Sequence, residues 1–343
     1  LAAAPEGKAR RLAWVHVDLE ARPWTQGPVF RSLEEERKAY ARFQTVAHVS
    51  QTVREAFERR FGAHAGSVVL HNPVDRDAVR SGASAAEEVP EKKCFRFVSV
   101  GRLEEQKGFD RLVTACRYLA QEGFSFHLWI LGEGPERKTL ERMIAEGNLQ
   151  GRISLLGQLE NPYPYVKAAD WLVCSSRSEG YSTVISESLI LGTPVAATLC
   201  SGVREQLGDG EFGLIAENHL LGLYRALEDI LTGKADRRDY CGRALRGGSR
   251  FDLDGQMNAV KELFEEIILQ LMTQKGQNNW QWKANHNRIN TDTQRISDCI
   301  DKLIGFEKLS KMFQSYPRAV PYSKRRCIVF KCDNYAAHWN IGK

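Results

Sequence analysis

The chain has 343 residues, 43% of them hydrophobic and 27% charged, which is enough for two domains with separate apolar cores. Its 48 basic and 43 acidic side chains leave a net charge of only +5, spread over many segments, so the composition argues against a nucleic-acid-binding protein. No run approaches the roughly twenty apolar residues that cross a bilayer, and LAAAPEGKARR at the start lacks the apolar core of a signal peptide. We therefore expect a cytoplasmic protein, for which peripheral contact with the inner face of a membrane is an alternative.

The cysteines do not form a metal-binding pattern. They lie at positions 94, 116, 174, 200, 241, 299, 327 and 332, mostly in apolar segments, and no pair has a two-residue spacing. We interpret them as buried thiols and not as zinc ligands or disulfides. Cys327 and Cys332 near His338 leave metal binding as the alternative for the basic tail.

The first 90 residues have an irregular pattern. It predicts a strand at 12–17 and helices at 33–43 and 53–61, which is part of a domain. Residues 72–75, Asn-Pro-Val-Asp, are typical of a turn. The stretch 81–93, rich in Ala, Ser, Glu and Lys, is typical of an interdomain linker. Residues 1–90 are thus predicted to be a partial N-terminal domain and linker.

From residue 91 to 271 the pattern alternates short apolar runs with amphipathic stretches, as in a parallel sheet with crossover helices. The expected strands are 97–100, 126–131, 153–156, 171–174 and 194–197, and the clearest helices are 109–121, 136–146 and 183–191. Each of the first four strands is followed by Gly101, Gly132, Gly157 or Ser175. In a doubly wound sheet such loops form the ligand-binding edge.

Residues 272–343 differ in composition. Asn, Gln, Thr and charged residues dominate their first third, and a weak helical pattern follows at 296–313. We expect an irregular tail of unknown role.

The loop GRLEEQKG at 101–108 carries two cations directly after a buried strand. Arg102 and Lys107 could neutralise a diphosphate, since Arg can also donate two parallel hydrogen bonds to phosphate oxygens. The alternative is an exposed loop with surface salt bridges.

A second motif, 176–198, places Glu179 and Glu187 around the start of a helix near Ser182. The free amides and positive dipole end of that helix suit a phosphate. Two carboxylates beside a phosphate site make good acceptors for the hydroxyls of a sugar and a ribose.

Four separate loops carry a resemblance to a known family: GRL with a following QKG, the GEGP turn at 132–135, the segment GQLENPYPYVKAADWLVCSSRSEG, and the paired glutamates followed by LGTPVAAT. Over about residues 66–270 the chain resembles glycosyltransferase family 4. The resemblance implies an α/β fold of the GT-B type, with twin Rossmann-like domains, here with the N-terminal domain incomplete and the donor domain complete. It implies retention at the anomeric carbon, a nucleotide-diphosphate donor, expected to be a UDP-sugar, and no metal or cofactor.

The resemblance also implies residue roles. Arg102 and Lys107 would hold the diphosphate, Glu179 the transferred sugar and Glu187 the ribose. The further donor-binding residues would be Gly101, Gly132, Gly134, Gly157, Asn161, Gly180, Tyr181, Ser182, Thr183 and Val184. The segment at 13–19 makes His16 the candidate from the first domain, although a structural histidine is the alternative. The predicted catalytic set is therefore Glu179, His16, Arg102 and Lys107.

Two other patterns have simpler explanations. Asp252 and Asp254 resemble a metal-binding acidic triplet, but they stand where a helix begins, so a helix cap is the better interpretation. GEGP lacks the third glycine and the distant acid of a dinucleotide site.

The resemblance implies several further βα units before the segment at residue 13, about half of the acceptor domain, so we expect the acceptor domain of the given sequence to be incomplete. The leading hypothesis is a glycosyltransferase that acts on a glycan or lipid-linked acceptor in surface polysaccharide synthesis. The alternative is a noncatalytic or degenerate nucleotide-sugar-binding fragment, and donor cleavage would separate the two. An epimerase on the same twin fold is a third interpretation.

Overall fold

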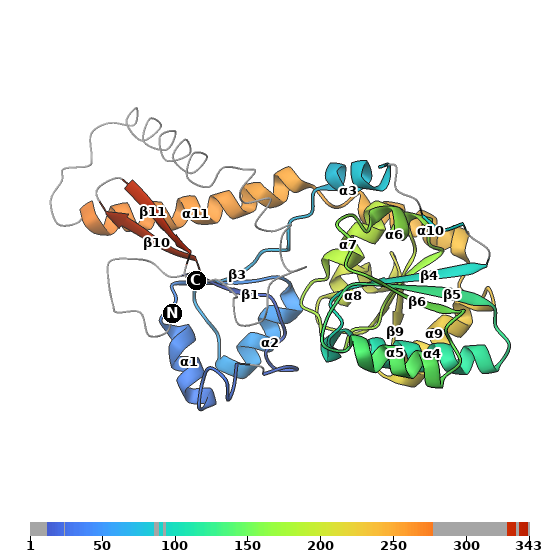
Figure 1. The fold of residues 1–343 in the computed structure, drawn as a ribbon. Coiled ribbons are helices and arrows are strands. Elements are labelled where there is room, and N and C mark those ends of the chain that lie inside the picture. The colour runs from blue at the N-terminus through green and yellow to red at the C-terminus, as the bar shows by residue number, and fades with distance from the viewer. Residues whose placement is uncertain are drawn as a thin grey trace.

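The computed structural model describes residues 12–23, 25–85, 89–91, 94–276, 328–333 and 336–341. Figure 1 shows a larger lobe built on a six-stranded sheet and a smaller lobe built on a three-stranded sheet. The α/β class with parallel sheets agrees with the expectation from the sequence.

The larger sheet contains β4 (Phe95–Val100), β5 (Phe126–Leu131), β6 (Ile153–Gly157), β7 (Trp171–Cys174), β8 (Val195–Thr198) and β9 (Leu214–Ala216). All neighbouring strands are parallel, in the order β6-β5-β4-β7-β8-β9. The order runs outward in one direction from β4 to β6 and in the other from β7 to β9. A doubly wound sheet of this kind opens a crevice where the order reverses, here between the carboxyl ends of β4 and β7.

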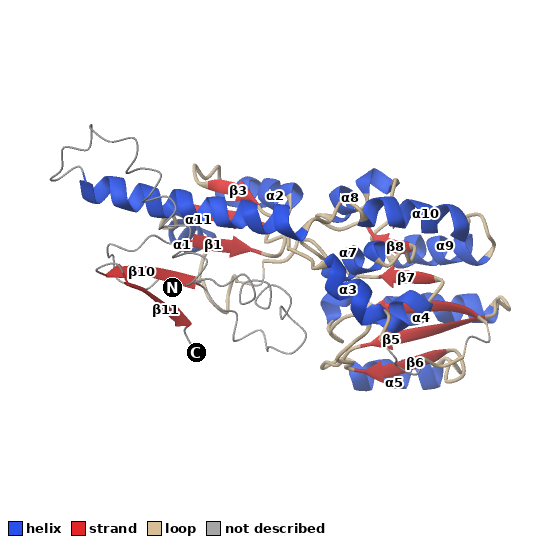
Figure 2. Ribbon diagram, turned by 90° about the horizontal axis from the view of Figure 1, so that it is seen from above, coloured by secondary structure: helices blue, strands red, loops and turns tan. Residues whose placement is uncertain are grey.

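Helices cover both faces of this sheet (Figure 2). One face packs under α4 (Phe109–Gln121), α5 (Arg137–Glu146) and α9 (Leu220–Leu231), and the other under α6 (Tyr163–Ala168), α7 (Thr183–Ile190) and α10 (Arg237–Gly248). Successive strand residues point to opposite faces, so Phe97 joins the first core and Val98 the second. Burial on both faces explains why these strands read as continuous apolar runs.

The smaller lobe consists of β1 (Leu12–Val15), β2 (Thr45–His48), β3 (Ser67–Val69), α1 (Leu33–Ala41) and α2 (Gln51–Phe61). The strands are parallel in the order β1-β2-β3. Ser32 and Ser50 cap the two helices by accepting hydrogen bonds from Glu35 N and Val53 N. The core of this lobe is continuous with the α7 face of the larger sheet.

The expected linker begins later than predicted. Residues 81–83 belong to α3 (Arg76–Ala83), which Asp75 caps by accepting a hydrogen bond from Ala78 N at 2.8 Å. The cap explains why the turn at 72–75 leads into a helix. Asn161 Nδ2 donates to Gly82 O at 2.9 Å and ties this helix to the larger lobe.

The remaining elements are short or lie near the C-terminus. They are the 3-10 turns η1 (Glu105–Lys107) and η2 (Gly208–Gly210), and the helices α8 (Val203–Gln206) and α11 (Leu253–Gly276). Asp252 accepts a hydrogen bond from Gly255 N at 3.1 Å, so the interpretation as a helix cap is confirmed. From there α11 extends toward the smaller lobe (Figure 1).

Two strands interrupt the segment that we expected to be irregular. β10 (Ile328–Asp333) and β11 (Ala336–Ile341) form an antiparallel pair. The helical pattern at 296–313 and Cys327 lie outside the described residues. Within the ranges given above, no helix combines the length and apolar character needed to cross a bilayer.

Candidate functional site

A cavity of about 360 Å³ opens at the carboxyl ends of β4 and β7, at the point where the strand order reverses. The loops after β4, β5, β6 and β7 line it from the larger lobe, together with the first turn of α7. The chain around β1 and the segment 72–79 line it from the other side. The cavity therefore lies where a doubly wound sheet places its ligand.

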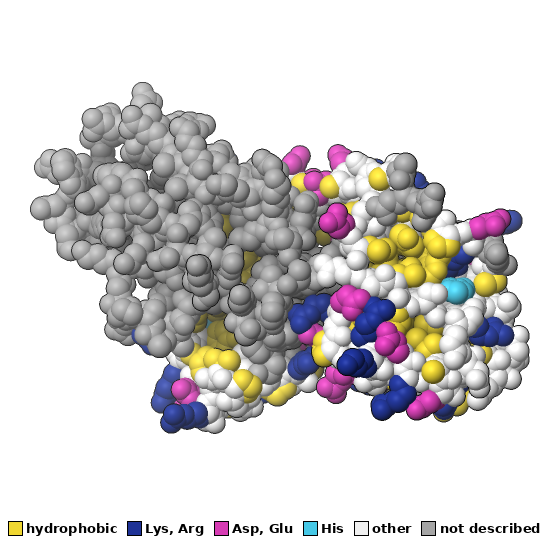
Figure 3. Space-filling model, viewed as in Figure 1, with side chains coloured by type: hydrophobic (Ala, Val, Ile, Leu, Met, Phe, Trp, Pro, Cys, Tyr) yellow, Lys and Arg dark blue, Asp and Glu magenta, His cyan; other side chains and the backbone are white. Residues whose placement is uncertain are grey.

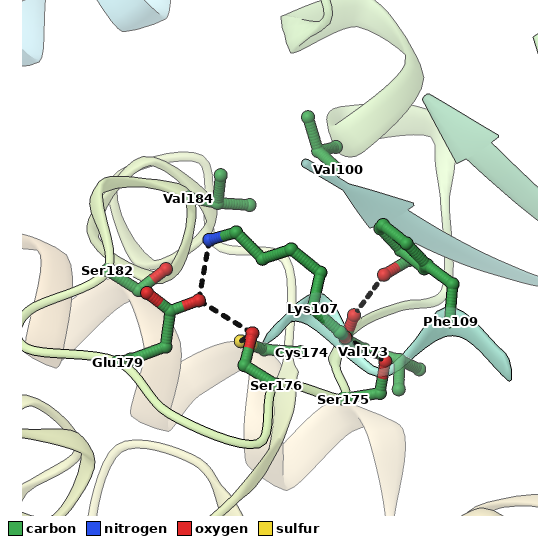
Figure 4. Close-up of a pocket in the computed structure, with 11 residues that line it drawn as sticks. Val100, Lys107, Phe109, Val173, Cys174, Ser175, Ser176, Glu179, Ser182 and Val184 are labelled. Carbon is green, nitrogen blue, oxygen red and sulfur yellow. Dashed lines mark hydrogen bonds and ion pairs between the residues drawn. The ribbon is translucent and has the colours of Figure 1, made fainter. Parts of the chain in front are cut away.

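The loop after β4 contributes both predicted cations. Lys107 Nζ forms an ion pair with Glu179 Oε1 at 2.6 Å, and Arg102 forms one with Glu104. Ser175 Oγ donates to Lys107 O at 2.9 Å, which fixes the β4 loop against the β7 loop. Figure 4 shows the Lys107 side chain reaching across to Glu179.

Glu179 is held on one oxygen. Its Oε1 accepts from Lys107 Nζ and also from Ser176 Oγ at 2.6 Å. Burial alone would lower the pKa of Lys107, but the negative charge and hydrogen bond of Glu179 outweigh it, so the pKa is raised. Lys107 is thus a fixed positive charge at the switch point, the place between β4 and β7 where the strand order reverses.

The start of α7 faces the same cavity. Ser182, Thr183 and Val184 all contribute to its lining. The amide of Ser182 is already engaged, because Ser182 N donates to Gln206 Oε1 at 3.2 Å. Ser182 was predicted to bind the donor, and the structure shows its amide occupied by Gln206, whereas the amides of Thr183 and Val184 have no acceptor within the helix.

Glu187 lies one turn further along α7 and is 9% exposed. It lines the cavity with Glu179, so the spacing of seven residues between them does bring both carboxylates to one site. Tyr163 OH donates to Glu187 Oε1 at 3.2 Å. This contact joins α6 to α7, so no local sequence pattern indicates it.

The glycines of the two motifs are required by close backbone contacts. Gly132 has φ of +143°, and a Cβ there would lie 1.8 Å from Gly101 O. A Cβ at Gly180 would lie 2.2 Å from His16 O, so this glycine lets the β1 end of the smaller lobe approach. A Cβ at Gly134 would likewise lie too close to the backbone, 2.4 Å from Leu103 O.

Four residues of the predicted donor set do not line the cavity: Gly134, Gly157, Gly180 and Asn161. Close packing accounts for Gly134 and Gly180, and Gly157 has φ of +76°, a left-handed conformation. Asn161 holds α3 through Gly82 O. For these four residues the structure shows packing, backbone conformation and hydrogen bonding, and their role in donor binding stays a prediction.

His16 does reach the cavity. It follows β1, lines the cavity beside Val17, and its ring stacks on Trp14 with 5.8 Å between centroids. The structure thus brings all four predicted catalytic residues, Glu179, His16, Arg102 and Lys107, to one cavity. Their chemical roles stay predictions.

The segment that we interpreted as a turn takes part in the site. Asn72 Nδ2 donates to Tyr181 O at 3.0 Å, and the His71 ring stacks on Tyr181 with 4.6 Å between centroids. His71 Nε2 also lies 2.5 Å from Glu205 Oε1, and Glu205 Oε2 accepts from Gln51 N at 2.9 Å. The interdomain segment, α2 and α8 therefore hold the β7 loop together.

The charges around the cavity suit a ligand that has both phosphates and hydroxyls. The lining carries two cations, Arg102 and Lys107, and the larger set of five carboxylates, those of Asp75, Glu104, Glu133, Glu179 and Glu187. On the face shown in Figure 3, basic and acidic side chains are likewise interspersed. Among the described residues, no cluster of three or more His, Cys, Asp or Glu side chains could hold a metal ion. The described cysteines at 94, 116, 174, 200 and 241 are free thiols.

Comparison with known proteins identifies the segment that builds this cavity. Residues 83–246 match the family model of glycosyl transferases group 1. This segment is therefore similar to the group 1 glycosyltransferases. The family consists of transferases, which agrees with the enzyme class expected from the sequence.

Two curated relatives are each about one third identical to this chain over the aligned part of their sequences. One is the N-acetylgalactosamine-N,N'-diacetylbacillosaminyl-diphospho-undecaprenol 4-alpha-N-acetylgalactosaminyltransferase of Campylobacter jejuni, 34% identical over 54% of this chain and 49% of that protein. The other is the lipopolysaccharide core biosynthesis glycosyltransferase LpsE of Rhizobium meliloti, 34% identical over 52% of this chain and 49% of that protein. The chain thus spans about half the length of these relatives.

Solved structures share the fold at lower identity. Anabaena Alr3699/HepE in complex with UDP superposes with a TM-score of 0.61 and 20% identity, covering 74% of this chain and 72% of that one. The pneumococcal O-GlcNAc transferase GtfA, in complex with UDP and GlcNAc, gives 0.60 and 16%, covering 75% and 52%. The chain has the GT-B type fold of these glycosyltransferases.

Proposed function

We propose that the chain transfers a sugar from a nucleoside diphosphate donor, a UDP-sugar, to a glycan or lipid-linked acceptor, with retention at the anomeric carbon. The observation that supports this most strongly is the Lys107–Glu179 ion pair at the switch point, beside the start of α7. At this place the cavity brings together a fixed cation, the free amides at the start of α7, and a carboxylate.

In this proposal the leaving group is stabilised by Lys107, Arg102 and the amides of Thr183 and Val184. Negative charge grows on the distal phosphate as the bond to the anomeric carbon breaks, and preorganised donors lower the energy of that state. The dipole of α7 adds positive potential at the same place. These groups would supply the charge neutralisation that a metal ion provides in other transferases.

The carboxylates would hold hydroxyl groups. Glu179 accepts from Lys107 and Ser176 on Oε1, so Oε2 is the oxygen that would accept from the transferred sugar. Because Glu179 is held in this way, we propose departure and attack on the same face of the sugar, without an enzyme-bound glycosyl intermediate. Glu187 would bind the ribose, with Tyr163 setting its orientation.

The acceptor class follows from the relatives. The Campylobacter jejuni protein is named for a diphospho-undecaprenol substrate and the Rhizobium meliloti protein for lipopolysaccharide core synthesis. We propose a related lipid-linked or glycan acceptor in surface polysaccharide synthesis, met at the cytoplasmic face of a membrane. His16 would face the transferred sugar from the smaller lobe.

Calorimetric titration of UDP into the purified chain tests the donor site. We expect micromolar affinity, about 8 kcal/mol of binding free energy. The double variant Lys107→Ala, Glu187→Ala should lose it, while the matched double variant Lys234→Ala, Glu141→Ala should not, since Lys234 and Glu141 have side chains 69% and 52% exposed. Absence of UDP binding to the folded wild-type chain would contradict the proposal.

The second candidate function is a nucleotide-sugar-binding module without turnover. It is favoured by the small contribution of the smaller lobe, whose described residues supply His16 and Val17 from the β1 end to the lining. Release of UDP from UDP-sugars, with and without added lipid-linked acceptors, decides between the two. UDP binding with no release under any condition would support the module.

A further inference from the structure

The side chain of Gln206 makes an unusual set of contacts for a buried polar group. It is 1% exposed and lies at the end of α8. Its Nε2 donates to Ser182 O at 2.6 Å and to Ser186 Oγ at 2.7 Å, while its Oε1 accepts from Ser182 N at 3.2 Å. One side-chain amide thus pairs with both backbone groups of a single residue, as a neighbouring strand would.

That residue is the one from which α7 starts. Ser182 is the N-cap of α7, yet its own side chain makes no capping hydrogen bond. Its backbone is fixed instead by Gln206, which stands 24 residues further along the chain. The orientation of the next two amides, those of Thr183 and Val184, depends on this fixed starting point.

We propose that Gln206 is a positioning residue for the distal phosphate of the donor. It acts by holding the Ser182 backbone so that the amides of Thr183 and Val184 point at the phosphate that Lys107 also contacts. The inference rests on the proposed function. A shift of about 1 Å in such donors is enough to weaken their effect, since their strength depends on prior alignment.

A purely structural role for Gln206 makes a different prediction. Loss of a buried hydrogen-bond partner leaves Ser182 N and O unsatisfied and destabilises the fold in general. Such a loss would affect every nucleotide equally. A positioning role affects only ligands that carry the distal phosphate, so UDP and UMP separate the two.

The experiment compares UDP and UMP affinities by calorimetry in wild type, Gln206→Leu and Gln206→Glu, at a temperature where circular dichroism shows each to be folded. We expect Gln206→Leu to bind UDP roughly tenfold more weakly, the loss of about one well-placed hydrogen bond to a charged group, with UMP affinity changed less than about twofold. Gln206→Met serves in its place if Gln206→Leu does not fold. The control Arg204→Ala lies on the same helix, with a side chain 58% exposed, and should change neither affinity.

Gln206→Glu adds a pH readout. A protonated Glu can donate to Ser182 O as Gln206 does, whereas an ionised Glu cannot donate and adds negative charge near the phosphate. Burial at this position should raise the pKa of the introduced carboxyl above its usual value, so the ratio of wild-type to variant UDP affinity should fall as the pH is lowered from 7.5 to about 5.5.

The outcomes separate this inference from the proposed function. If wild type does not bind UDP, both are overturned. If wild type binds UDP but Gln206→Leu loses UDP and UMP affinity equally, or loses neither, only the positioning role of Gln206 is overturned.

Discussion

The two parallel sheets of this molecule differ in one property that decides where a ligand can bind. The order β6-β5-β4-β7-β8-β9 reverses between β4 and β7, whereas β1-β2-β3 follows the chain in one direction. Loops at the reversal point diverge to opposite faces and leave a crevice. The loops of the larger sheet therefore supply most of the cavity lining, and the described part of the smaller lobe closes the cavity with His16 and Val17.

Truncation of one buried phenylalanine in each lobe should have the largest effect on stability and should test whether the two lobes differ in ligand binding. Phe97 in β4 is fully buried and Phe57 in α2 is 1% exposed. Each change to Ala should lower the free energy of unfolding by about 3–5 kcal/mol, because it removes a large apolar side chain and leaves a cavity. Urea titration measures this loss.

The two truncations should differ in ligand binding. Phe97 lies in the strand that leads to the Lys107 loop, so Phe97→Ala should weaken UDP binding to the folded protein. Phe57→Ala should leave it nearly unchanged. Loss of UDP binding in folded Phe57→Ala would contradict the division of labour between the lobes.

The smaller lobe should be sensitive to acid through His48. This side chain is fully buried, donates or accepts at Ser67 Oγ over 2.7 Å, and burial lowers its pKa to about 4. The unfolded chain, with a pKa near 6.5, therefore binds more protons between pH 6.5 and 4, so stability falls as the pH falls through this window. The loss should reach about 3 kcal/mol at pH 4.

Urea unfolding at several pH values checks this effect in wild type and in His48→Asn, which cannot titrate there. The difference in stability between the two proteins should shrink or change sign as the pH falls from 6.5 to 4. Parallel pH profiles for the two would show that His48 is not the acid-sensitive group.

Glu179→Gln tests the proposed role of the Glu179 carboxylate in the larger lobe. Removal of the carboxylate frees Lys107 and removes a negative charge beside the diphosphate, so UDP should bind roughly threefold more tightly, about 0.6 kcal/mol. Turnover of a UDP-sugar should fall, because the sugar loses its acceptor. Calorimetry with UDP and assay of UDP release measure the two effects. Glu141→Gln, on the exposed face of α5, is the control; weaker UDP binding in Glu179→Gln would contradict the assigned role.

Helix caps give the smallest expected effects and test whether the lobes unfold together. Ser32 caps α1 in the smaller lobe, and Asp236 caps α10 in the larger one. Each change to Ala should cost about 1 kcal/mol. Because the apolar core is continuous between the lobes, both substitutions should shift a single thermal transition. Two separate transitions, each moved by one variant, would overturn that expectation.

The larger sheet could be predicted closely from the sequence. The strands at Phe126–Leu131 and Trp171–Cys174 and the helix at Phe109–Gln121 have the expected bounds. The two strands are apolar runs followed by Gly132 and Ser175, and the helix is strongly amphipathic. Strands β2 (Thr45–His48), β3 (Ser67–Val69) and, in the larger sheet, β9 (Leu214–Ala216) were missed, because they have only three or four residues each.

Site residues that lie together in one loop motif could be predicted from the sequence. Contacts between residues of different helices could not. Arg102, Lys107, Glu179 and Glu187 reach the cavity as expected. Gln206 and Tyr163 have no local pattern, since each meets its partner 24 residues away through the packing of separate helices. Only the structure shows that the Ser182 amide donates its hydrogen bond to Gln206.

The central claim is that a nucleoside diphosphate binds at the reversal point of the larger sheet. Its most direct test is a crystal structure of the chain grown with UDP. We predict diphosphate density within hydrogen-bonding distance of Lys107 Nζ and of the amides of Thr183 and Val184, with the ribose at Glu187. UDP bound elsewhere, or a diphosphate that contacts none of these groups, would contradict the account.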